Sequence, residues 1–367
     1  MSDNILHSTE HKTHDFLAEE LLVPNLNKSS ANRINMFCSN IMQAVVLKNG
    51  QKPRVFTNFE NQIGEISYAY RKLDRDYTII DIIDKDDTKM NRVIIMIDSD
   101  SNLDMINIQD CHNITEEYGF VYINYLTDAV IGDVLPKDTV VYHSTAYDQS
   151  LNLSYGTNLR AVYFPMLGVT YEDGIVISET AASKLTHYTV TEVMVSVNTN
   201  NILLNLYGDE SHYKCLPDIG SYTKDGIVCG RRVIDYNTMM RTMTTDALMT
   251  LDETDTCFYA SGQVVDIQVF CNKEKEILAK NEYNSQILDI LADQEIYQER
   301  MFELINKLKD QGVTLSDELS YQYSRLKDII EDGKKYVSDN SAFDNLVIKI
   351  KIKEEHAAKI GSKVTNR

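Results

Sequence analysis

Apolar residues recur at helical spacing near the start of the chain. Five of them follow Ser30 on one helical face, before the turn Asn49-Gly50 (Ile34, Cys38, Ile41, Met42 and Val45). Ser30 or Asn32 can cap such a segment, so the pattern predicts a helix that starts there and ends near Val46. The polar residues 1–20 are expected to form a mobile or partner-bound lead-in.

From about residue 55 to residue 272 the pattern changes to short runs of β-branched and aromatic residues, bounded by Asp, Asn or Gly. Frequent turn signals without helical spacing between the runs favour barrels and small sheets over a doubly wound α/β sheet. The predicted strands are 77–83, 92–97, 119–125, 160–164, 174–177, 191–197, 226–229 and 262–270.

A longer helical pattern follows these strands. Residues 274–335 contain no proline and carry a heptad seam, with Gln294 as its polar exception (Ile290, Tyr297, Met301, Leu304 and Leu308). Asp310-Gln311-Gly312 interrupts the seam, which predicts an antiparallel αα-hairpin with a second helix over 317–332. Residues 347–353 then alternate between apolar residues and Lys, which predicts a strand with one lysine face.

Composition limits the class of protein. The chain has 367 residues, 43% of them apolar and 25% charged, which allows a sizeable core and suggests two or three modules. No apolar run is long enough for a signal peptide or a membrane span. Six scattered cysteines lack metal-ligand spacing, so we expect reduced thiols of a cytoplasmic protein without structural zinc.

Charge is distributed unevenly along the chain. The formal net charge is −19, yet residues 21–59 and 149–171 contain no acidic side chain, and residues 346–367 carry six basic side chains against two acidic ones. An acidic exterior around a basic seam suits a protein that grips a polyanion in one place and avoids it elsewhere. Burial of the acid-free segments is the alternative, because buried segments also lack carboxylates.

Three short polar motifs lie in these regions. Arg33 stands at the start of the predicted helix, where a guanidinium and the helix N-terminus can bind phosphate. Glu172 and Asp173 are adjacent on a predicted turn, and such carboxylates can hold Mg²⁺ directly or through water. Lys363 follows a Gly-Ser pair that lets the backbone approach a polyanion closely. The plain alternatives are a surface arginine, a solvated turn and a basic tail.

Other familiar motifs fail on their spacing. Residues 98–102 open like a calcium loop, but Leu103 stands where the bend needs Gly, and Gln109 stands where a bidentate Glu is needed. His143-Ser144 has no third partner for a hydrolytic triad. The glycine loop that cradles phosphates in nucleotide-binding proteins does not occur in the sequence.

Taken in order, the motifs resemble those of the β subunit of bacterial-type multisubunit DNA-dependent RNA polymerases. The similarity starts at Leu22-Val23-Pro24 and Ala31-Asn32-Arg33 and spans nearly the whole chain. Its further matches are Gln43-Ala44-Val45, Lys52-Pro53, Gly156-Thr157-Asn158-Leu159-Arg160, Tyr171-Glu172-Asp173, Ile175-Val176-Ile177-Ser178-Glu179, Gly262-Gln263-Val264-Val265-Asp266 and Lys359-Ile360-Gly361-Ser362-Lys363.

This resemblance implies roles for the matching residues. Arg33 would contact substrate or transcript phosphates, and Glu172 and Asp173 would lie near a second Mg²⁺ that is shared with a β′-like partner. Lys363 would touch the RNA backbone or the reacting phosphate. Further contacts to RNA or DNA would come from Gln43, Arg160, Lys359 and Arg367.

The chain also departs from the family pattern. Ser39 stands where the family has an asparagine, no aspartate triplet for a first catalytic metal occurs, and the His-Gly-Asn-Lys-Gly segment that follows in the family is not found after Arg367. We therefore expect one piece of a split β subunit or a trimmed chain. Such a pattern resembles the split polymerases of giant bacteriophages.

The expected fold is α+β, with part of a double-psi-type β-barrel, β-rich insertions, a flap-like module and an αα-hairpin. Six segments are expected along the chain. They are a polymerase core segment with the Arg33 motif (1–60), an acidic β-rich module (61–148), a barrel segment with Glu172-Asp173 (149–215), a flap-like region with a return strand (216–271), the αα-hairpin (272–340), and a barrel strand with a basic C-terminal loop (341–367).

The expected function is that of a β-like subunit of a DNA-directed RNA polymerase, a nucleotidyltransferase complex in which this chain is inactive alone. Its partners would be β′-like subunits, the remaining pieces of the split β subunit, DNA template, RNA transcript and nucleoside triphosphates. The enzyme would work in the host cytoplasm or travel in a virion, with no membrane partner. The alternative is a non-catalytic nucleic-acid-binding or assembly protein that retains the polymerase barrel.

Overall fold

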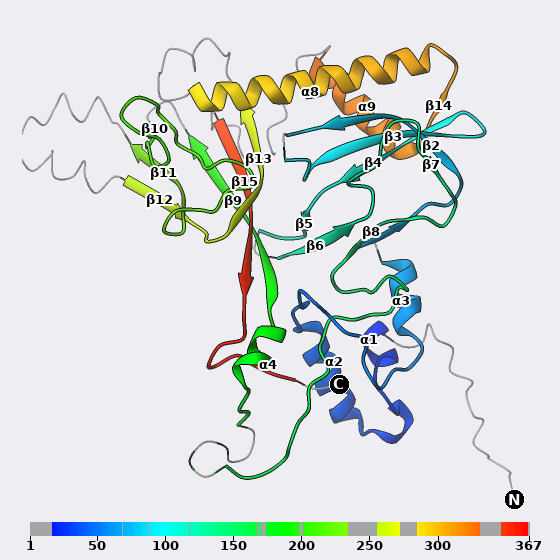
Figure 1. Cartoon of the computed structure of the whole chain (residues 1–367), viewed down its shortest axis with the longest axis vertical. Coiled ribbons are helices and arrows are strands. Elements are labelled where there is room, and N and C mark those ends of the chain that lie inside the picture. The colour runs from blue at the N-terminus through cyan, green and yellow to red at the C-terminus, as the bar shows by residue number, and fades with distance from the viewer. Residues whose placement is uncertain are drawn as a thin grey trace, which may run out of the picture. The chain divides into compact units, whose positions relative to one another are not determined.

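The computed structural model describes residues 17–67, 69–86, 88–116, 118–166, 168, 170, 174–197, 201–233, 255–271, 285–330 and 346–365. Contacts divide the chain into two compact units. The first unit combines Met1–Tyr70, His143–Tyr188 and His356–Arg367, and the second unit combines Arg71–Tyr142 and Thr189–Glu355. The chain is an α+β protein whose helices and sheets come from different stretches of the sequence (Figure 1).

Short helices characterise the first unit. They are α1 (Ala18–Leu21), the 3₁₀ turn η2 (Leu26–Lys28), α2 (Ala31–Met42), α3 (Glu60–Ile66) and α4 (Glu179–Lys184). As predicted, α2 begins directly after Ser30, but it ends at Met42, before the expected Val46. The sequence pattern does not predict α3. Its first residue, Glu60, accepts hydrogen bonds from the Thr57 N–H at 2.9 and 3.2 Å, a contact that apolar spacing does not reveal.

The described strands form four sheets. The five-stranded sheet has the order β14-β4-β3-β2-β7 (Thr314–Leu315, Asn102–Ile108, Arg92–Asp98, Tyr77–Asp84, Val134–Leu135). The four-stranded sheet has the order β1-β8-β6-β5 (Tyr70–Lys72, Val140–Ser144, Gly119–Asn124, Cys111–Asn113). The three-stranded sheets are β13-β15-β9 (Gln263–Cys271, Leu346–His356, His187–Val197) and β10-β11-β12 (Asn201–Leu203, Ile227–Val233, Asp255–Tyr259).

Most predicted strands are confirmed, and two are wrong. The runs 160–164 and 174–177 have no regular secondary structure, and their apolar side chains face solvent. Val162 and Tyr163, for example, are 83% and 92% exposed. The residue types suit a strand, but a strand needs a neighbour that pairs with its backbone, and no described strand pairs with these runs.

The continuous apolar run in β3 reflects burial on both faces of its sheet. Ile94 and Met96 join one buried cluster, and Val93 and Ile95 join another on the opposite face. Alternating side chains of a strand point to opposite faces, so a strand covered on both sides needs no polar positions. The second of these clusters also contains residues of the αα-hairpin.

The predicted αα-hairpin is present as α8 (Ser285–Lys309) and α9 (Asp317–Ile330). The two halves of α8 belong to different cores: Ile287 and Leu291 pack with β13 and β15, whereas Met301 and Ile305 pack with β2, β3 and β4. Figure 1 shows α8 as one long helix along these sheets. Neither α8 nor any other helix in the described part of the chain is long and apolar enough to cross a membrane.

Gln294, the polar exception on the heptad seam, satisfies the edge of β13. Its side-chain Oε1 accepts the Val269 N–H at 2.8 Å, and its Nε2 donates to the Val269 carbonyl at 3.0 Å. Gln286 makes the equivalent pair of contacts with the Leu216 N–H and carbonyl at 3.0 and 3.1 Å. β13 is an edge strand, so a glutamine amide here supplies the hydrogen bonds that a neighbouring strand would otherwise make.

We expect Gln294→Ala to lower the free energy of unfolding by about 1–3 kcal/mol, because it leaves a partly buried backbone donor and acceptor unpaired. Urea unfolding followed by circular dichroism measures the change. Gln298→Ala is the matched control. This glutamine lies on the same helix, and its side chain makes no hydrogen bond to a described residue. Equal losses in the two variants would contradict the assigned role.

Candidate nucleic-acid interface

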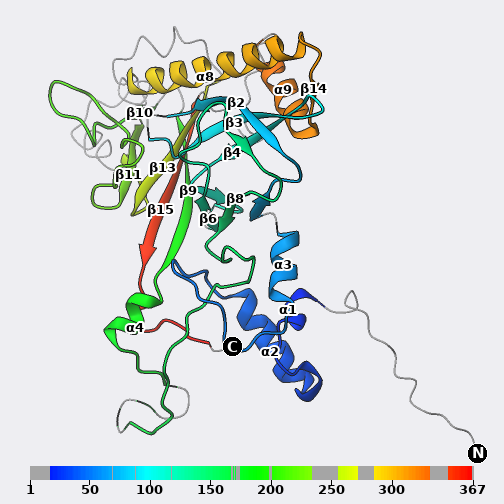
Figure 2. The same cartoon turned by 45° about the vertical axis from the view of Figure 1, so that its right-hand side comes forward.

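The first unit collects three segments that are far apart in sequence. Arg33 comes from the first segment, Arg160 from the second and Lys363 from the third. In both Figure 1 and Figure 2 the described chain after β15 runs back towards α2. The cationic residues singled out from the sequence therefore belong to one compact unit, although their side chains make no described contact with one another.

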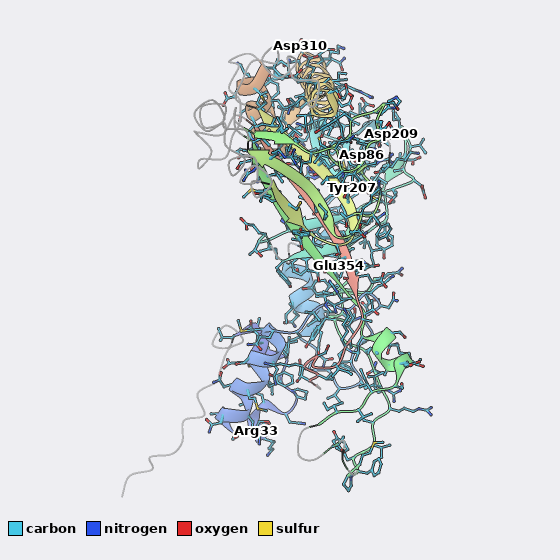
Figure 3. All side chains as sticks on the ribbon, turned by 90° about the vertical axis from the view of Figure 1, so that its left-hand side faces the viewer. Arg33, Asp86, Tyr207, Asp209, Asp310 and Glu354 are labelled. Carbon is cyan, nitrogen blue, oxygen red and sulfur yellow. The ribbon has the colours of Figure 1, made fainter. Side chains whose placement is uncertain are left out.

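Arg33 lies in the first turn of α2, and its side chain is exposed (Figure 3). The nearest described polar contact is the Met36 sulfur, 3.6 Å from Nη1. No acidic residue stands in the first turn of α2. Gln43 is the C-cap of this helix and is also exposed. The guanidinium thus keeps its planar set of donors available for an anion.

The chain after α2 is joined to the second segment by backbone hydrogen bonds. The Leu47 N–H donates to the Tyr155 carbonyl at 3.2 Å, and the Gln51 N–H donates to the Gly156 carbonyl at 2.7 Å. These bonds hold 47–51 against 155–156, with isolated bridge pairing at Gln51 and Gly156. They fix the start of the segment that carries Arg160 relative to the segment that carries Arg33.

Gly50 permits the close approach of these two segments. A Cβ atom at this position would lie 1.5 Å from the Ser154 carbonyl oxygen, so no larger residue fits without moving the backbone. Lys48 adds a bond from its N–H to the Thr186 carbonyl at 2.8 Å, just beyond α4. The Asn49-Gly50 pair that marks a turn in the sequence is therefore also a packing requirement.

Asn158 continues this frame toward Arg160. Its N–H donates to the Gln51 side-chain oxygen at 3.0 Å, and its Nδ2 donates to the Lys52 carbonyl at 3.0 Å. Arg160 follows two residues later with an exposed side chain. A side-chain amide thus holds the backbone beside a cation that has no described partner.

Glu172 and Asp173, the predicted metal-binding pair, lie outside the described residues. The chain before them forms a tight turn, in which the Thr170 N–H donates to the Met166 carbonyl at 3.0 Å and the Met166 N–H donates to Thr170 Oγ1 at 2.9 Å. Gly168 in this turn has a φ of +80°, which favours glycine. After the pair, Ser178 caps α4 through its side chain.

The C-terminal motif forms a reciprocal turn. The Lys359 N–H donates to Ser362 Oγ, and the Ser362 N–H donates to the Lys359 carbonyl, both at 3.0 Å. Gly361 has a φ of +92°, so the small residues before Lys363 serve the turn itself. Lys359 and Lys363 are both exposed, and Arg367 lies outside the described residues.

The two units differ in how their cations are paired with carboxylates. All ion pairs between described residues, such as Arg92 with Asp84 at 2.7 Å and Lys85 with Asp266 at 2.8 Å, lie within the second unit. In the described part of the first unit, eight exposed cations have no described carboxylate partner. They are Lys28, Arg33, Lys52, Arg54, Arg160, Lys184, Lys359 and Lys363. Such uncompensated charge raises the local concentration of anions.

The lysine face of β15 does not belong to this basic surface. Lys349 pairs with Glu192 at 3.3 Å, and Lys353 pairs with Asp110, and all four side chains are largely buried. The expectation that the basic side chains of residues 346–367 contribute to a basic seam is therefore wrong for these two lysines. A charge that a sheet partly buries needs a compensating partner, and the acidic second unit supplies it.

Asp98, the first residue of the calcium-like segment 98–102, has a structural role. The buried Asp98 carboxylate accepts hydrogen bonds from the N–H groups of Asp100 and Asn102 and from Arg75 Nη1, each at 2.8 Å. Its acceptors close the β3–β4 turn. Within the described ranges, no group of three metal-ligating side chains gathers at one point.

The cysteines are free thiols, and those of the cores are unreactive. Cys111 and Cys215 are buried, and this burial raises the pKa of each thiol to about 12. Because the thiolate is the reactive form, neither residue suits nucleophilic or redox chemistry at neutral pH.

Apolar patterning predicted strands where the structure has an exposed apolar strip, which we define as residues 159–166 together with Ile175 and Val176. Phe164 in this strip is 64% exposed, and Ile175 and Val176 are 60% and 54% exposed. Contiguous exposed apolar residues of this kind mark interaction surfaces. From the sequence, the only hint that this strip is exposed is that its residues are apolar, whereas the loops of the second unit are polar.

Comparison with known proteins gives a partial match. No protein-family model matches the chain. Over 213 residues, or 56% of the chain, it is 26% identical to the DNA-directed RNA polymerase subunit beta of Thermosipho melanesiensis. The chain is similar to RNA polymerase β subunits. It is also 28% identical over 158 residues, or 43% of its length, to the protein of the same name from Chlamydia caviae.

The alignments cover only a small part of these relatives. They span 17% of the Thermosipho melanesiensis protein and 12% of the Chlamydia caviae protein. Both names agree with the β-subunit resemblance of the sequence motifs. The bacteriophage origin, the six-segment division and the roles of individual site residues stay predictions.

The Asp98 turn predicts a specific dependence of stability on acid. Burial by itself would raise the pKa of Asp98, but the hydrogen bonds from Asn102, Arg75 and Asp100 outweigh burial and lower it to about 2. A carboxyl group whose pKa is lower in the folded state stabilises the protein above its unfolded pKa of about 3.9. That contribution is lost as the pH falls from about 4 toward 2.

We therefore expect Asp98→Asn to reduce the free energy of unfolding by about 1–3 kcal/mol at neutral pH and to flatten its decline in acid. Urea unfolding at a series of pH values measures both effects. Asp100→Asn is the control, because the Asp100 side chain is exposed and only its backbone takes part in the turn. A stability curve for Asp98→Asn that runs parallel to wild type would rule out this role.

Proposed function

We propose that the chain is a β-like subunit of a DNA-directed RNA polymerase that contributes substrate-phosphate, second-metal and RNA contacts to nucleotidyl transfer. One observation carries this proposal. Eight exposed cations without a described carboxylate partner occur in the unit that carries the Arg33, Arg160 and Lys363 motifs, whereas many cations of the second unit form ion pairs, with exposed exceptions such as Lys89 and Lys137. The names of the similar proteins support the same class.

In the proposed reaction the RNA 3′-hydroxyl attacks the α-phosphate of a nucleoside triphosphate in line with the departing pyrophosphate. Negative charge on the phosphoryl oxygens increases in the transition state. Arg33 would donate its planar set of N–H groups to these oxygens, and Lys363 would place an ammonium group beside the RNA backbone or the reacting phosphate. Gln43, Arg160, Lys359 and Arg367 would bind RNA or DNA around this centre.

Glu172 and Asp173 would hold Mg²⁺, directly or through water. Carboxylate oxygens are the ligands that this hard cation prefers, so the donor set fits the ion. When bound, Mg²⁺ supplies charge neutralisation at the substrate phosphates. The described turn before the pair and the capped helix after it would limit how far the two carboxylates move.

The proposed fold is part of a double-psi-type β-barrel that other chains complete. The long strands β9, β13 and β15 of one sheet would form its described portion, and the exposed apolar strip would pair with partner strands on assembly. A β′-like subunit and further β pieces would be these partners, as in a split phage polymerase. The chain would be inactive without them, and the β10-β11-β12 sheet would belong to the flap-like region.

The first test of this function is Arg33→Ala in the reconstituted complex. We expect a lower kcat/KM for nucleoside triphosphates, about tenfold for each ~1.4 kcal/mol of transition-state stabilisation lost. Arg33→Lys should recover only part of it, because an ammonium lacks the planar fork. Lys137→Ala, an exposed cation of the second unit, is the matched control. Unchanged nucleotide dependence with intact assembly would favour the non-catalytic nucleic-acid-binding alternative.

The acidic pair is tested through metal dependence. We expect Asp173→Ala to raise the Mg²⁺ concentration needed for half-maximal elongation, because one of two proposed ligands is lost. Glu179→Ala removes an exposed carboxylate from the first turn of α4 and serves as the control. A wild-type Mg²⁺ titration for Asp173→Ala would show that the pair is a solvated turn.

A further inference from the structure

The first unit contains an apolar groove of about 320 Å³ that is lined in part by the end of α1. Its apolar walls come from two stretches of chain, Leu21 to Leu26 and Val55 to Phe59. We propose that this groove binds one base of a single-stranded nucleic acid, while Lys52 and Arg54 bind the flanking phosphates. The inference deepens the proposed function and rests on it for the presence of a nucleic-acid strand at this unit.

Phe56 provides the stacking surface. It is 49% exposed at the groove, and its neighbour Val55 is 54% exposed. Lys52 Nζ lies 4.8 Å from the centroid of the Phe56 ring, so a cation already occupies the neighbourhood of the aromatic face. Proteins that bind single strands combine an aromatic platform with cations that follow the backbone, because every base offers a π-face.

Cations flank the groove. Lys52 and Arg54 lie just before Val55, the first lining residue of one wall, and Lys28 lies two residues after Leu26, which lines the other wall. All three cations are exposed, and none forms an ion pair with a described residue. Base stacking at the floor and phosphate binding at the rim require this combination of apolar and cationic groups.

Hydrogen bonds hold both walls in place before any ligand binds. Thr57 Oγ1 donates to the Leu21 carbonyl at 2.7 Å, which ties one wall to the other. The Thr57 N–H is held by the buried Glu60, and the Lys52 carbonyl is held by Asn158 Nδ2. A groove fixed at both ends loses little conformational entropy on binding, which favours a specific contact.

The charges favour a polyanion over a polypeptide with basic residues. Glu20 is the only carboxylate that lines the groove among the described residues, and it accepts the Leu17 N–H at 3.0 Å. Three cations therefore face one carboxylate that already has a hydrogen-bond donor. An uncharged apolar peptide segment is the competing occupant, and its binding would not depend on these cations.

The experiment uses the full chain and a fluorescently labelled single-stranded oligoadenylate RNA, with anisotropy measured over a range of salt concentrations. We expect Lys52→Ala/Arg54→Ala to weaken binding about tenfold or more. It should also make the slope of log K against log salt less steep by about 1.4, or 0.7 for each lost phosphate contact. Phe56→Ala should weaken binding about fivefold or more, and Phe56→Tyr should restore it.

Lys89→Ala/Lys137→Ala is the matched control, because it removes two exposed cations from the second unit. Wild-type affinity and slope in Lys52→Ala/Arg54→Ala would overturn the proposal, as would failure of the wild-type chain to bind the RNA at low salt. The latter result would leave a peptide segment as the occupant. Neither outcome touches the Arg33 kinetics, so failure of the groove and failure of the polymerase function are distinguishable.

Discussion

The close approach of Gly50 to Ser154 is the constraint on which the first unit depends. It allows the backbone bonds at Leu47 and Gln51 to form, and these bonds join stretches that are about a hundred residues apart. The three large apolar clusters lie in the second unit, and α1, α2 and α4 bury no residue. Hydrogen bonds and a few close contacts, rather than a large apolar core, therefore hold the described part of the first unit together. A unit with so little buried apolar area is only marginally stable alone and gains stability from whatever binds it.

Electrostatics give the two units different properties. The second unit contains the described ion pairs, including those of the β15 lysines, and has more carboxylates than cations, so each paired cation lies in acidic surroundings. The first unit leaves its cations exposed while the chain as a whole is strongly acidic. A polyanion is repelled by the whole protein at long range and attracted by one part of it at short range. This arrangement favours one orientation of a bound strand over many weak, non-specific ones.

Periodicity predicted the elements whose burial partner lies in the same chain. The strands around Ile94 and the αα-hairpin have apolar faces that neighbouring described elements cover. The helix after Ser30 was predicted from its helical repeat alone, since it buries no residue. The runs around Val162 and Ile175 misled the prediction, because a pattern reports that a segment is suited to burial but not what buries it. Motif order predicted the site residues, and two of them, Arg33 and Lys363, belong to one unit of the fold. Motif order could not indicate that Lys349 and Lys353 are neutralised, since their carboxylate partners come from other stretches of the chain.

The exposed apolar strip has a consequence for the life of the chain in a cell. The strip exposes an apolar surface, formed by Val162, Tyr163 and Phe164, that can bind other proteins non-specifically until a partner covers it. A newly made copy is then a substrate for chaperones and proteases, and two copies that meet each other first risk aggregation. Synthesis of this chain in step with the protein that covers the strip would limit both losses. The strip would thereby couple the abundance of the chain to the supply of the proposed assembly partner.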